Sequence, residues 1–253
     1  MAVIPLLSAA GVGLRRGRAS ILQDISFELN GGELVMLAGP NGAGKSTLLH
    51  ILAGQLMPEQ GTLQLDGQDC RGFGPRHWAQ QITLLPQLSS MSFPLSVQEV
   101  VELGGLAHSR SVVALRQQVQ AALADWDITA LATRDVRLLS GGEQQRCQLA
   151  RSWVQVQQPQ SRLWLLDEPL SALDLRHQQQ CMQHIRQLTG AGRTVVMVMH
   201  DLNLARRFAD RVLLLSAGRL VADGAARDVL TPEQVSETYR VDTVLEGDYL
   251  YWQ

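Results

Sequence analysis

The stretch Gly39-Pro40-Asn41-Gly42-Ala43-Gly44-Lys45-Ser46 decides the fold of this chain of 253 residues. It follows a short apolar run, residues 33–38, which is predicted to be a buried strand. It precedes residues 48–52, whose leucines and isoleucine have helical spacing. Strand, glycine-rich loop and helix in this order form half of a βαβ unit. Because the stretch also matches G-x-x-x-x-G-K-[ST] completely, the sequence predicts a phosphate-binding loop.

Each part of this loop has an expected role. Glycine allows backbone N–H groups to curl around phosphate oxygens, and the start of a helix adds a favourable dipole. We expect Lys45 to reach the outer phosphates of a nucleotide and the Ser46 hydroxyl to bind Mg²⁺. The predicted nucleotide contacts are Gly39, Pro40, Asn41, Gly42, Ala43, Gly44, Lys45, Ser46 and Thr47.

Two acids end a second apolar strand, residues 163–166. Such a strand can hold Asp167 near Mg²⁺, while Glu168 orients and partly deprotonates an attacking water. The structural alternative is a helix cap, because acids after a strand often begin a helix and Pro169 follows. The phosphate loop upstream favours the catalytic interpretation.

A second glycine-rich segment, Leu139-Ser140-Gly141-Gly142-Glu143-Gln144-Gln145-Arg146, lies far from the first. Ser140 and Glu143 have the spacing of a capping box, so an ordinary well-capped helix would explain them. The two glycines also expose backbone N–H groups at a helix start, which makes a second anion site. A symmetric dimer would let one nucleotide use the loop of one chain and the Ser140 helix of the other.

Composition and pattern bound the remaining possibilities. Hydrophobic residues make up 45% and the net charge is −2, which gives no nucleic-acid footprint. We find no apolar run near the length needed to span a bilayer, and no secretory signal at the N-terminus. Cys70, Cys147 and Cys181 are too widely spaced for a metal site or disulfide framework, so a reducing compartment is expected.

The middle of the chain differs from both ends. Residues 88–158 show helix signals and no convincing strand, including a capping-box spacing at Ser96 and Glu99. A further strand is predicted at 194–199. We therefore predict a single domain, 1–253. Its α/β core spans about 1–87 and 159–235, interrupted by a helical insertion at 88–158, and a C-terminal extension covers 236–253.

The segment Leu-Ser-Gly-Gly-Glu-Gln resembles the signature motif of ABC ATPases, and other family elements follow in order. Gln87 resembles the Q-loop glutamine, Asp174 belongs to a segment similar to the D-loop, and His200 resembles the switch histidine that touches the γ-phosphate. The resemblance covers roughly residues 5–245. It implies a P-loop NTPase (RecA-like) core with an inserted helical subdomain and an N-terminal antiparallel β region.

The same resemblance implies ATP hydrolysis with ATP and Mg²⁺ as cofactors. The implied catalytic residues are Glu168, His200, Gln87 and Lys45, and the implied metal ligands are Ser46, Gln87 and Asp167. Ser140, Gly141, Gly142, Glu143 and Asp174 join the nucleotide contacts. One feature departs from the family: residues 12–17 lack the aromatic residue that often stacks on adenine. Arg15 or Arg16 could stack instead, or Leu14 could give an apolar contact.

Finer resemblance points to importers of iron chelates, haem and cobalamin, with haem importer ATPases the most similar. It rests on residues 93–101, 173–179, 200–205 and the tail 229–239. An iron-siderophore or cobalamin importer is the alternative, and a split exporter or soluble ABC ATPase fits less well. The implied partners are a second copy, two membrane permease subunits and, indirectly, a periplasmic substrate-binding protein, with no nucleic acid. The implied location is the cytoplasmic face of a bacterial inner membrane.

Two surface features are open to interpretation. The apolar residues Met91, Phe93 and Leu95 could contact a membrane subunit or be buried within the helical insertion. The polar run 177–180 could suggest a metal or DNA site, but a solvated helix face explains it better.

Overall fold

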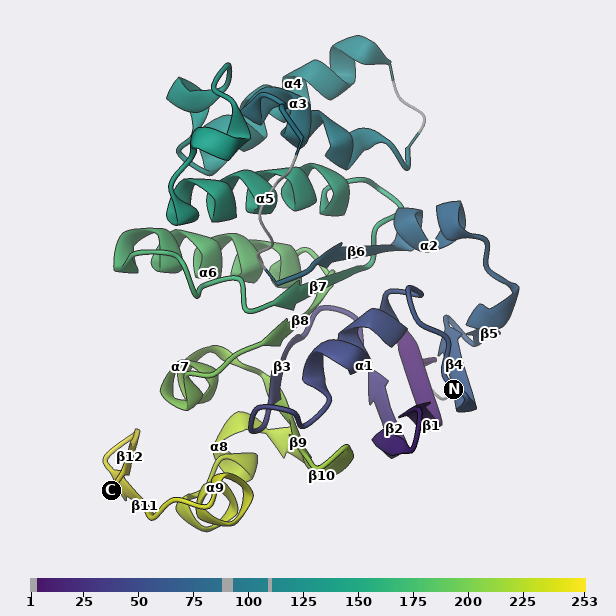
Figure 1. Cartoon of the computed structure of the whole chain (residues 1–253), viewed down its shortest axis with the longest axis vertical. Coiled ribbons are helices and arrows are strands. Elements are labelled where there is room, and N and C mark those ends of the chain that lie inside the picture. Colours follow the sequence, from purple (N-terminus) through teal and green to yellow (C-terminus); the bar gives the residue numbers. More distant parts are fainter. Residues whose placement is uncertain (1–3, 88–92, 109–110) are drawn as a thin grey trace. The chain divides into compact units, whose positions relative to one another are not determined.

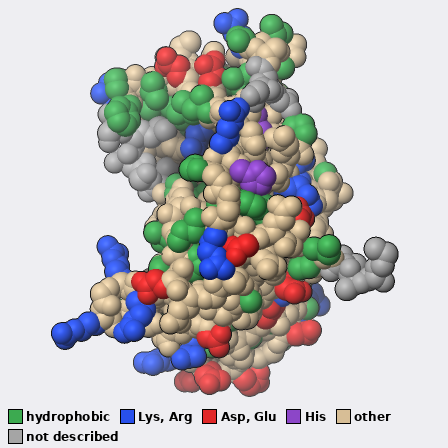
Figure 2. Space-filling view, turned by 90° about the vertical axis from the view of Figure 1, so that its right-hand side faces the viewer, with side chains coloured by type: hydrophobic (Ala, Val, Ile, Leu, Met, Phe, Trp, Pro, Cys, Tyr) green, Lys and Arg blue, Asp and Glu red, His purple; other side chains and the backbone are tan. Residues whose placement is uncertain are grey.

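Two compact units make up the computed structural model of the chain, and each is described by itself. The first unit comprises Met1–Phe73 and Leu188–Gln253, and the second comprises Gly74–Gln187. The structure describes residues 4–87, 93–108 and 111–253 (Figure 1). On the face drawn in Figure 2, basic and acidic side chains are interspersed, in keeping with the small net charge.

An antiparallel sheet opens the first unit. It contains β1 (Leu7–Arg16), β2 (Ala19–Leu29), β4 (Gln60–Leu65) and β5 (Gln68–Asp69), in the order β2-β1-β4-β5. Its central strand β1 pairs with β2 on one side and β4 on the other. A short helical turn, η1 (Cys70–Gly72), follows β5. This sheet is the predicted N-terminal antiparallel β region.

A second group of strands in this unit is mainly parallel. The strand β3 (Leu34–Ala38) pairs in parallel with β8 (Thr194–Val198) and β9 (Arg211–Ser216), and β10 (Arg219–Ala225) returns antiparallel to β9. Every residue of β3 and β8 is buried, and all of them except Thr194 are apolar, as is typical of strands covered on both faces. The helix α1 (Lys45–Leu52) follows the loop after β3.

Three helices and a hairpin complete the first unit: α7 (Leu202–Phe208), α8 (Ala226–Val229), α9 (Pro232–Tyr239), β11 (Thr243–Glu246) and β12 (Tyr249–Trp252). The helix α9 begins with a side-chain cap, because the Thr231 hydroxyl accepts a hydrogen bond from the Gln234 N–H and Pro232 occupies the first turn. The strands β11 and β12 pair antiparallel from Thr243–Trp252 to Glu246–Tyr249.

The second unit pairs β6 (Ile82–Leu85) in parallel with β7 (Leu163–Asp167). Its helices are α2 (Pro75–Gln81), α3 (Val97–Glu102), α4 (Val112–Asp125), α5 (Gly141–Val156) and α6 (Leu175–Gly190), whose last residues reach the first unit. The short turns are η2 (Leu103–Gly105), η3 (Thr129–Leu131) and η4 (Val136–Leu138). The range predicted as a helical insertion thus contains α3, α4 and α5.

Tryptophans fill the core of the second unit. The Trp153 ring centroid lies 6.1 Å from that of Trp126 and 5.8 Å from that of Trp164, and His184 of α6 packs on Trp126 and Trp153. The Trp153 indole N–H donates to Asp125 Oδ2 over 2.9 Å, so its polar atom is satisfied within the core. This cluster joins α4, α5, α6 and β7 into one body.

Candidate functional site

The phosphate loop of the first unit has a backbone that requires glycine. Gly39, Gly42 and Gly44 have φ angles of 140°, 79° and 102°, which L side chains rarely adopt. A Cβ atom at Gly39 would also lie 2.1 Å from the Leu215 carbonyl oxygen. The helix α1 begins directly after Gly44 without a side-chain cap. The loop is therefore a rigid turn whose backbone, rather than its side chains, forms the start of the helix.

Lys45 lies inside this turn. Its side chain is buried, and its Nζ donates to the carbonyl oxygens of Gly39 over 2.7 Å and of Pro40 over 3.0 Å. These bonds hold an ammonium group at the loop where the sequence places the outer phosphates. Ser46 and Thr47 follow within the first turn of α1. The positive charge and the helix dipole act together here to favour an anion.

His200 belongs to the same edge of the first unit as the loop. The parallel register aligns Leu37 of β3 with Val198 of β8, so the carboxyl ends of the two strands are neighbours. His200 is exposed just beyond β8. Asp201 then begins α7, because its Oδ1 accepts from the N–H groups of Asn203 and Leu204 over 2.9 Å each. The predicted switch histidine thus lies between a buried strand and a capped helix.

Gln87 and Glu168 meet in the second unit. They follow β6 and β7, whose register aligns Leu85 with Leu166, and the Gln87 Nε2 donates to Glu168 Oε2 over 3.2 Å. Asp167 is buried at the end of β7, while Glu168 is half-buried with a φ of 50°. A positive φ in a non-glycine residue is strained and turns the Glu168 side chain out of the strand path. The two predicted catalytic groups are therefore in direct contact.

The start of α5 carries a complete capping box. The Ser140 N–H and hydroxyl both donate to Glu143 Oε2, over 2.7 and 2.8 Å, and the Glu143 N–H donates back to Ser140 Oγ. The hydrogen bond from the Ser140 N–H, followed by that from its hydroxyl, lowers the pKa of Glu143. A Cβ atom at Gly141 would meet nothing within 4 Å, so this side of the helix start is open.

Two contacts that the sequence did not reveal tie this helix start to the residues after Glu168. A Cβ atom at Gly142 would lie 3.0 Å from the Ala172 carbonyl oxygen, and the buried Gln145 amide donates to the Pro169 carbonyl oxygen over 2.8 Å. The Glu168 carbonyl oxygen in turn accepts from Ser171. The signature segment, Glu168 and residues 171–174 thus form one connected patch within the second unit.

Asp174 takes the structural role of a helix cap. Its Oδ1 accepts from the N–H of His177 over 2.9 Å and from His177 Nδ1 over 2.8 Å. These bonds, the backbone one above all, lower the pKa of Asp174. Its side chain is 67% exposed, so it is also accessible to a ligand. A nucleotide contact by Asp174 stays a prediction.

The polar run 177–180 differs from the expected solvated helix face. The His177 side chain is only 13% exposed and contacts Arg146, and the Gln180 amide donates to the Asp125 carbonyl oxygen over 2.6 Å. Gln179 remains exposed. The expectation was wrong because the C-terminal end of α4 presents the Asp125 carbonyl oxygen to this helix, which an isolated helical pattern cannot show.

The three residues considered for contact with adenine lie at the end of β1. Arg15 and Arg16 are exposed at the end of this strand, and Leu14 is half-buried. All three side chains are thus accessible in the first unit. The choice among them stays a prediction.

A family model described as "ABC transporter" matches residues 22–171, more than half of the chain. The chain belongs to the ABC transporter family. A relative of this ABC-family chain is the hemin import ATP-binding protein HmuV of Pseudomonas entomophila, which is 41% identical over 95% of this chain and 95% of that protein. The protein of the same name from Aliivibrio fischeri is 42% identical over 95% of this chain and 93% of its own length.

Comparison with solved structures also points to ABC transporters. An ABC transporter assigned to the metal-chelate type, in an inward-facing conformation, matches with a TM-score of 0.78 and 28% identity over 98% of this chain and 96% of that chain. The predicted P-loop NTPase fold and the prediction of an ATP-hydrolysing transporter ATPase are both confirmed. Across residues 4–87, 93–108 and 111–253, no helix has the length and apolar character to span a membrane.

Proposed function

We propose that this ABC-family ATPase is the motor subunit of an importer, and that a homodimer of it couples ATP hydrolysis to haem uptake through two membrane subunits. The observation that carries the ATPase chemistry is the glycine-dependent loop with its buried Lys45 ammonium. The relatives named as hemin import proteins, 41–42% identical over nearly their whole length, support haem as the cargo. An iron-siderophore or cobalamin importer is the alternative.

The proposed chemistry is attack of water on the γ-phosphorus. Lys45 binds the outer phosphates, and the imidazole of His200 touches the γ-phosphate. The water oxygen bonds to phosphorus as the bond to the bridging oxygen breaks, and Glu168 accepts the proton that the water loses. The amide of Gln87 supports this role because its bond to Glu168 Oε2 orients the carboxylate.

Magnesium fits the donor set of the proposed site. Mg²⁺ prefers oxygen ligands and commonly uses one or two carboxylates together with substrate phosphates. The buried Asp167 carboxylate, the Gln87 amide oxygen and the Ser46 hydroxyl are all of this type. The described residues contain no cluster of three or more His, Cys, Asp or Glu that could hold a metal alone, so the nucleotide would supply the remaining ligands. Bound Mg²⁺ would neutralise charge that develops on the phosphates.

The dimer follows from the two anion sites. We propose that each nucleotide contacts the loop of one chain and the Ser140 helix start of the other. The open side of Gly141 supports this, because a ligand from outside the chain can approach the backbone there. Residues 171–174 lie beside this start, through the contact of Gly142 with Ala172, and would move with it.

The proposed contact with a membrane subunit lies just before α3. Phe93 is 74% exposed, so the alternative that it is buried within the helical part does not hold. Leu95 is half-buried, and Met91 lies outside the described residues. Phe93 is exposed and lies six residues after Gln87, the residue whose amide bonds to Glu168. A partner that binds Phe93 can therefore influence the position of Gln87. We propose that this contact holds the subunit peripherally on the cytoplasmic face of the inner membrane, with a periplasmic substrate-binding protein as an indirect partner.

Copurification tests the proposal. After mild detergent extraction the chain should retain a membrane protein, and a binding protein of the same system should carry a haem absorption band. A siderophore or cobalamin on that protein would replace haem as the cargo. Association with ribosomes or DNA, and with no membrane protein, would overturn the importer role.

Phe93→Asp tests the docking contact. A charge transferred into an apolar contact costs a few kcal/mol, so retention of the membrane subunit should fall at least about tenfold, while nucleotide affinity and Tm stay unchanged. Val113→Asp is the matched control, because Val113 is 67% exposed at the start of α4 in the same unit. Equal retention by the two variants would reject Phe93 as the contact.

A further inference from the structure

The C-terminal segment, residues 231–253, reaches the phosphate loop within the first unit. The hydroxyl of Tyr239, the last residue of α9, accepts a hydrogen bond from the Gly39 N–H over 2.8 Å. Gly39 is the first residue of the loop, and its carbonyl oxygen accepts from Lys45 Nζ over 2.7 Å. One residue is thus held on its N–H side by Tyr239 while its carbonyl holds the lysine ammonium.

Tyr239 ends a helix that is anchored to the rest of the first unit. Val235 and Thr238 of α9 are buried, and the helix ends at Arg240, whose φ of 58° reverses the chain. The Thr243 N–H then donates to Ser236 Oγ over 3.0 Å, which ties β11 back to α9. Burial raises the pKa of Tyr239 above its ordinary value of 10.0, so the hydroxyl is protonated at neutral pH.

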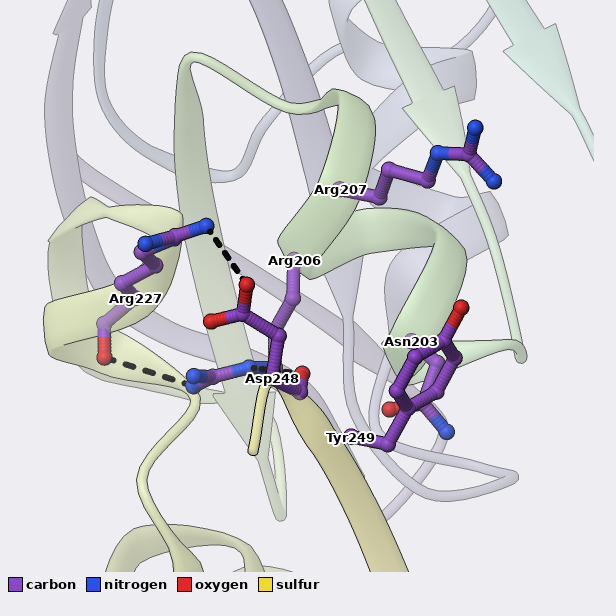
Figure 3. Close-up of a pocket in the computed structure, with 6 residues that line it drawn as sticks. All are labelled: Asn203, Arg206, Arg207, Arg227, Asp248 and Tyr249. Carbon is purple, nitrogen blue, oxygen red and sulfur yellow. Dashed lines mark hydrogen bonds and ion pairs between the residues drawn. The ribbon is translucent and has the colours of Figure 1, made fainter. Parts of the chain in front are cut away.

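The same segment also holds the helix after His200. Asn203 of α7 exchanges two hydrogen bonds with Leu250 of β12, its amide donating to the Leu250 carbonyl oxygen over 3.0 Å and its Oδ1 accepting from the Leu250 N–H over 2.8 Å. Residues of α7, α8 and the hairpin line a cavity of about 210 Å³ (Figure 3). Arg227 and Asp248 form an ion pair of 3.2 Å at its rim. The buried Leu250 side chain and these polar bonds therefore attach the hairpin to the rest of the first unit.

We propose that Tyr239 is a positioning residue for nucleotide binding, acting through Gly39 on the Lys45 ammonium. Gly39 has little freedom to compensate, because its φ is 140° and the Leu215 carbonyl oxygen lies against its Cα. Removal of the hydroxyl leaves the Gly39 N–H without its acceptor and loosens the residue that fixes Lys45. The C-terminal segment thereby connects the phosphate loop with the helix that follows His200.

Tyr239→Phe removes one oxygen atom and tests this role. We expect the Kd of a non-hydrolysable ATP analogue, and the KM for ATP, to rise roughly fivefold, which corresponds to about 1 kcal/mol. The kcat should change less than about twofold, since Glu168 is untouched. Amide exchange measured by mass spectrometry should quicken in the peptide that contains Gly39. The matched control is Tyr251→Phe, because Tyr251 is a half-exposed tyrosine of the same segment.

Two outcomes would overturn the proposal. If Tyr239→Phe and Tyr251→Phe have the same Kd and the same exchange at Gly39, the hydroxyl has no positioning role. If kcat falls while Kd is unchanged, Tyr239 acts on a later step and not on the loop. The proposal rests on the phosphate loop as the nucleotide site, which Lys45→Ala tests separately. Unchanged affinity in Lys45→Ala would reject the site itself, whereas weakened affinity there with a silent Tyr239→Phe would reject only the role of Tyr239.

Discussion

The starts of α1 and α5 are both rich in glycine, yet they satisfy their backbone groups in different ways. Before α1, the loop has no side-chain cap and carries a lysine ammonium bound to its own carbonyl oxygens. At α5, Ser140 and Glu143 form a capping box that occupies their N–H groups. The first start therefore offers an anion its backbone and a lysine ammonium, whereas the capping box at the second satisfies the N–H groups of Ser140 and Glu143 and leaves the side at Gly141 open.

A third helix start shows what the capping box itself contributes. At α3, Ser96 and Glu99 form the same reciprocal pair of bonds, but no glycine follows Ser96. What α5 adds is the open side at Gly141 and the close approach of Gly142 to residue 172. We infer that the glycines, and not the cap, make the start of α5 suited to a second nucleotide-binding role.

The largest expected effect is a loss of turnover without a loss of nucleotide affinity, from a substitution that leaves both helix starts unchanged. Glu168→Gln keeps the shape of the side chain but removes its basicity, so kcat should fall at least about 100-fold. Affinity for a non-hydrolysable ATP analogue should stay within about twofold of the parent, since neither helix start is altered. Steady-state ATPase assays and equilibrium binding measure the two effects. Glu237→Gln, an exposed glutamate on α9, is the control, and turnover equal to that control would remove Glu168 as the base.

Lys45→Ala removes the ammonium group at the start of α1. If the Lys45 ammonium makes the proposed charge-assisted bonds to phosphate, deleting it should raise the Kd of the analogue about 30–100-fold. Lys45 is the only lysine in the sequence, which offers a second measurement without mutation. Amine-reactive labelling should modify Lys45 in the free chain and be suppressed by bound nucleotide. Labelling that ignores nucleotide, together with unchanged affinity in the variant, would place the phosphates elsewhere.

Most of the fold was predictable because its signals are local. The strands β3, β7 and β8 each contain a continuous apolar run, and the caps at Ser96, Ser140 and Thr231 are readable from residues three positions apart. The Gln87–Glu168 contact was not stated by either segment alone. It follows from the parallel register of β6 and β7, which brings the ends of two distant strands together.

The contacts that the sequence did not reveal join elements by single polar bonds. Tyr239 lies 200 residues from Gly39, and nothing in either neighbourhood signals the pairing. Gln145 looks like one more polar residue in a glutamine-rich helix, yet it is buried against the Pro169 carbonyl oxygen. Periodicity describes which face of an element is polar, but it does not show which backbone oxygens another element will present to that face.

A substitution at the start of α5 should impair the proposed dimer and its ATPase activity, and leave nucleotide binding by the single chain nearly unchanged. In Ser140→Arg a bulky side chain blocks the helix start, so ATPase activity should fall at least about tenfold while the Kd of the analogue stays within about threefold. Ser96→Arg is the matched control, because it alters the same capping box on α3. Only Ser140→Arg should prevent nucleotide-induced dimers, as measured by light scattering on the Glu168→Gln background.

Mixing variants tests whether the two helix starts belong to one shared site. A pair of one Lys45→Ala chain and one Ser140→Arg chain retains one composite site with both parts intact. Activity should therefore return in part when the two inactive variants are combined. Full activity of Ser140→Arg alone, or no recovery on mixing, would refute a site shared between chains.

The smallest expected effect concerns the capping box itself. Hydrogen bonds from Ser140 lower the pKa of Glu143 below its ordinary value of 4.5, so its carboxylate stabilises the folded state fully above that value and progressively less as pH falls through the lowered pKa. Glu143→Gln should lower Tm by about 1–2 °C at pH 7, because the amide keeps a hydrogen bond but loses the charge at the helix start. Once the pH falls below this lowered pKa the two proteins should converge, since the parent carboxylate becomes protonated too.

Glu99→Gln supplies the comparison, because hydrogen bonds from Ser96 lower the pKa of Glu99 in the same way. If the Tm differences of the two variants depend on pH in the same way, the capping box of α5 without nucleotide contributes no more to stability than that of α3. Adding the ATP analogue should then distinguish the two variants. If the analogue binds in the closed dimer against the Ser140 start, it should change the Tm difference for Glu143→Gln and leave that for Glu99→Gln unchanged. A Tm difference for Glu143→Gln that persists at pH values below the lowered pKa of Glu143 would mean that the carboxylate charge is not its source.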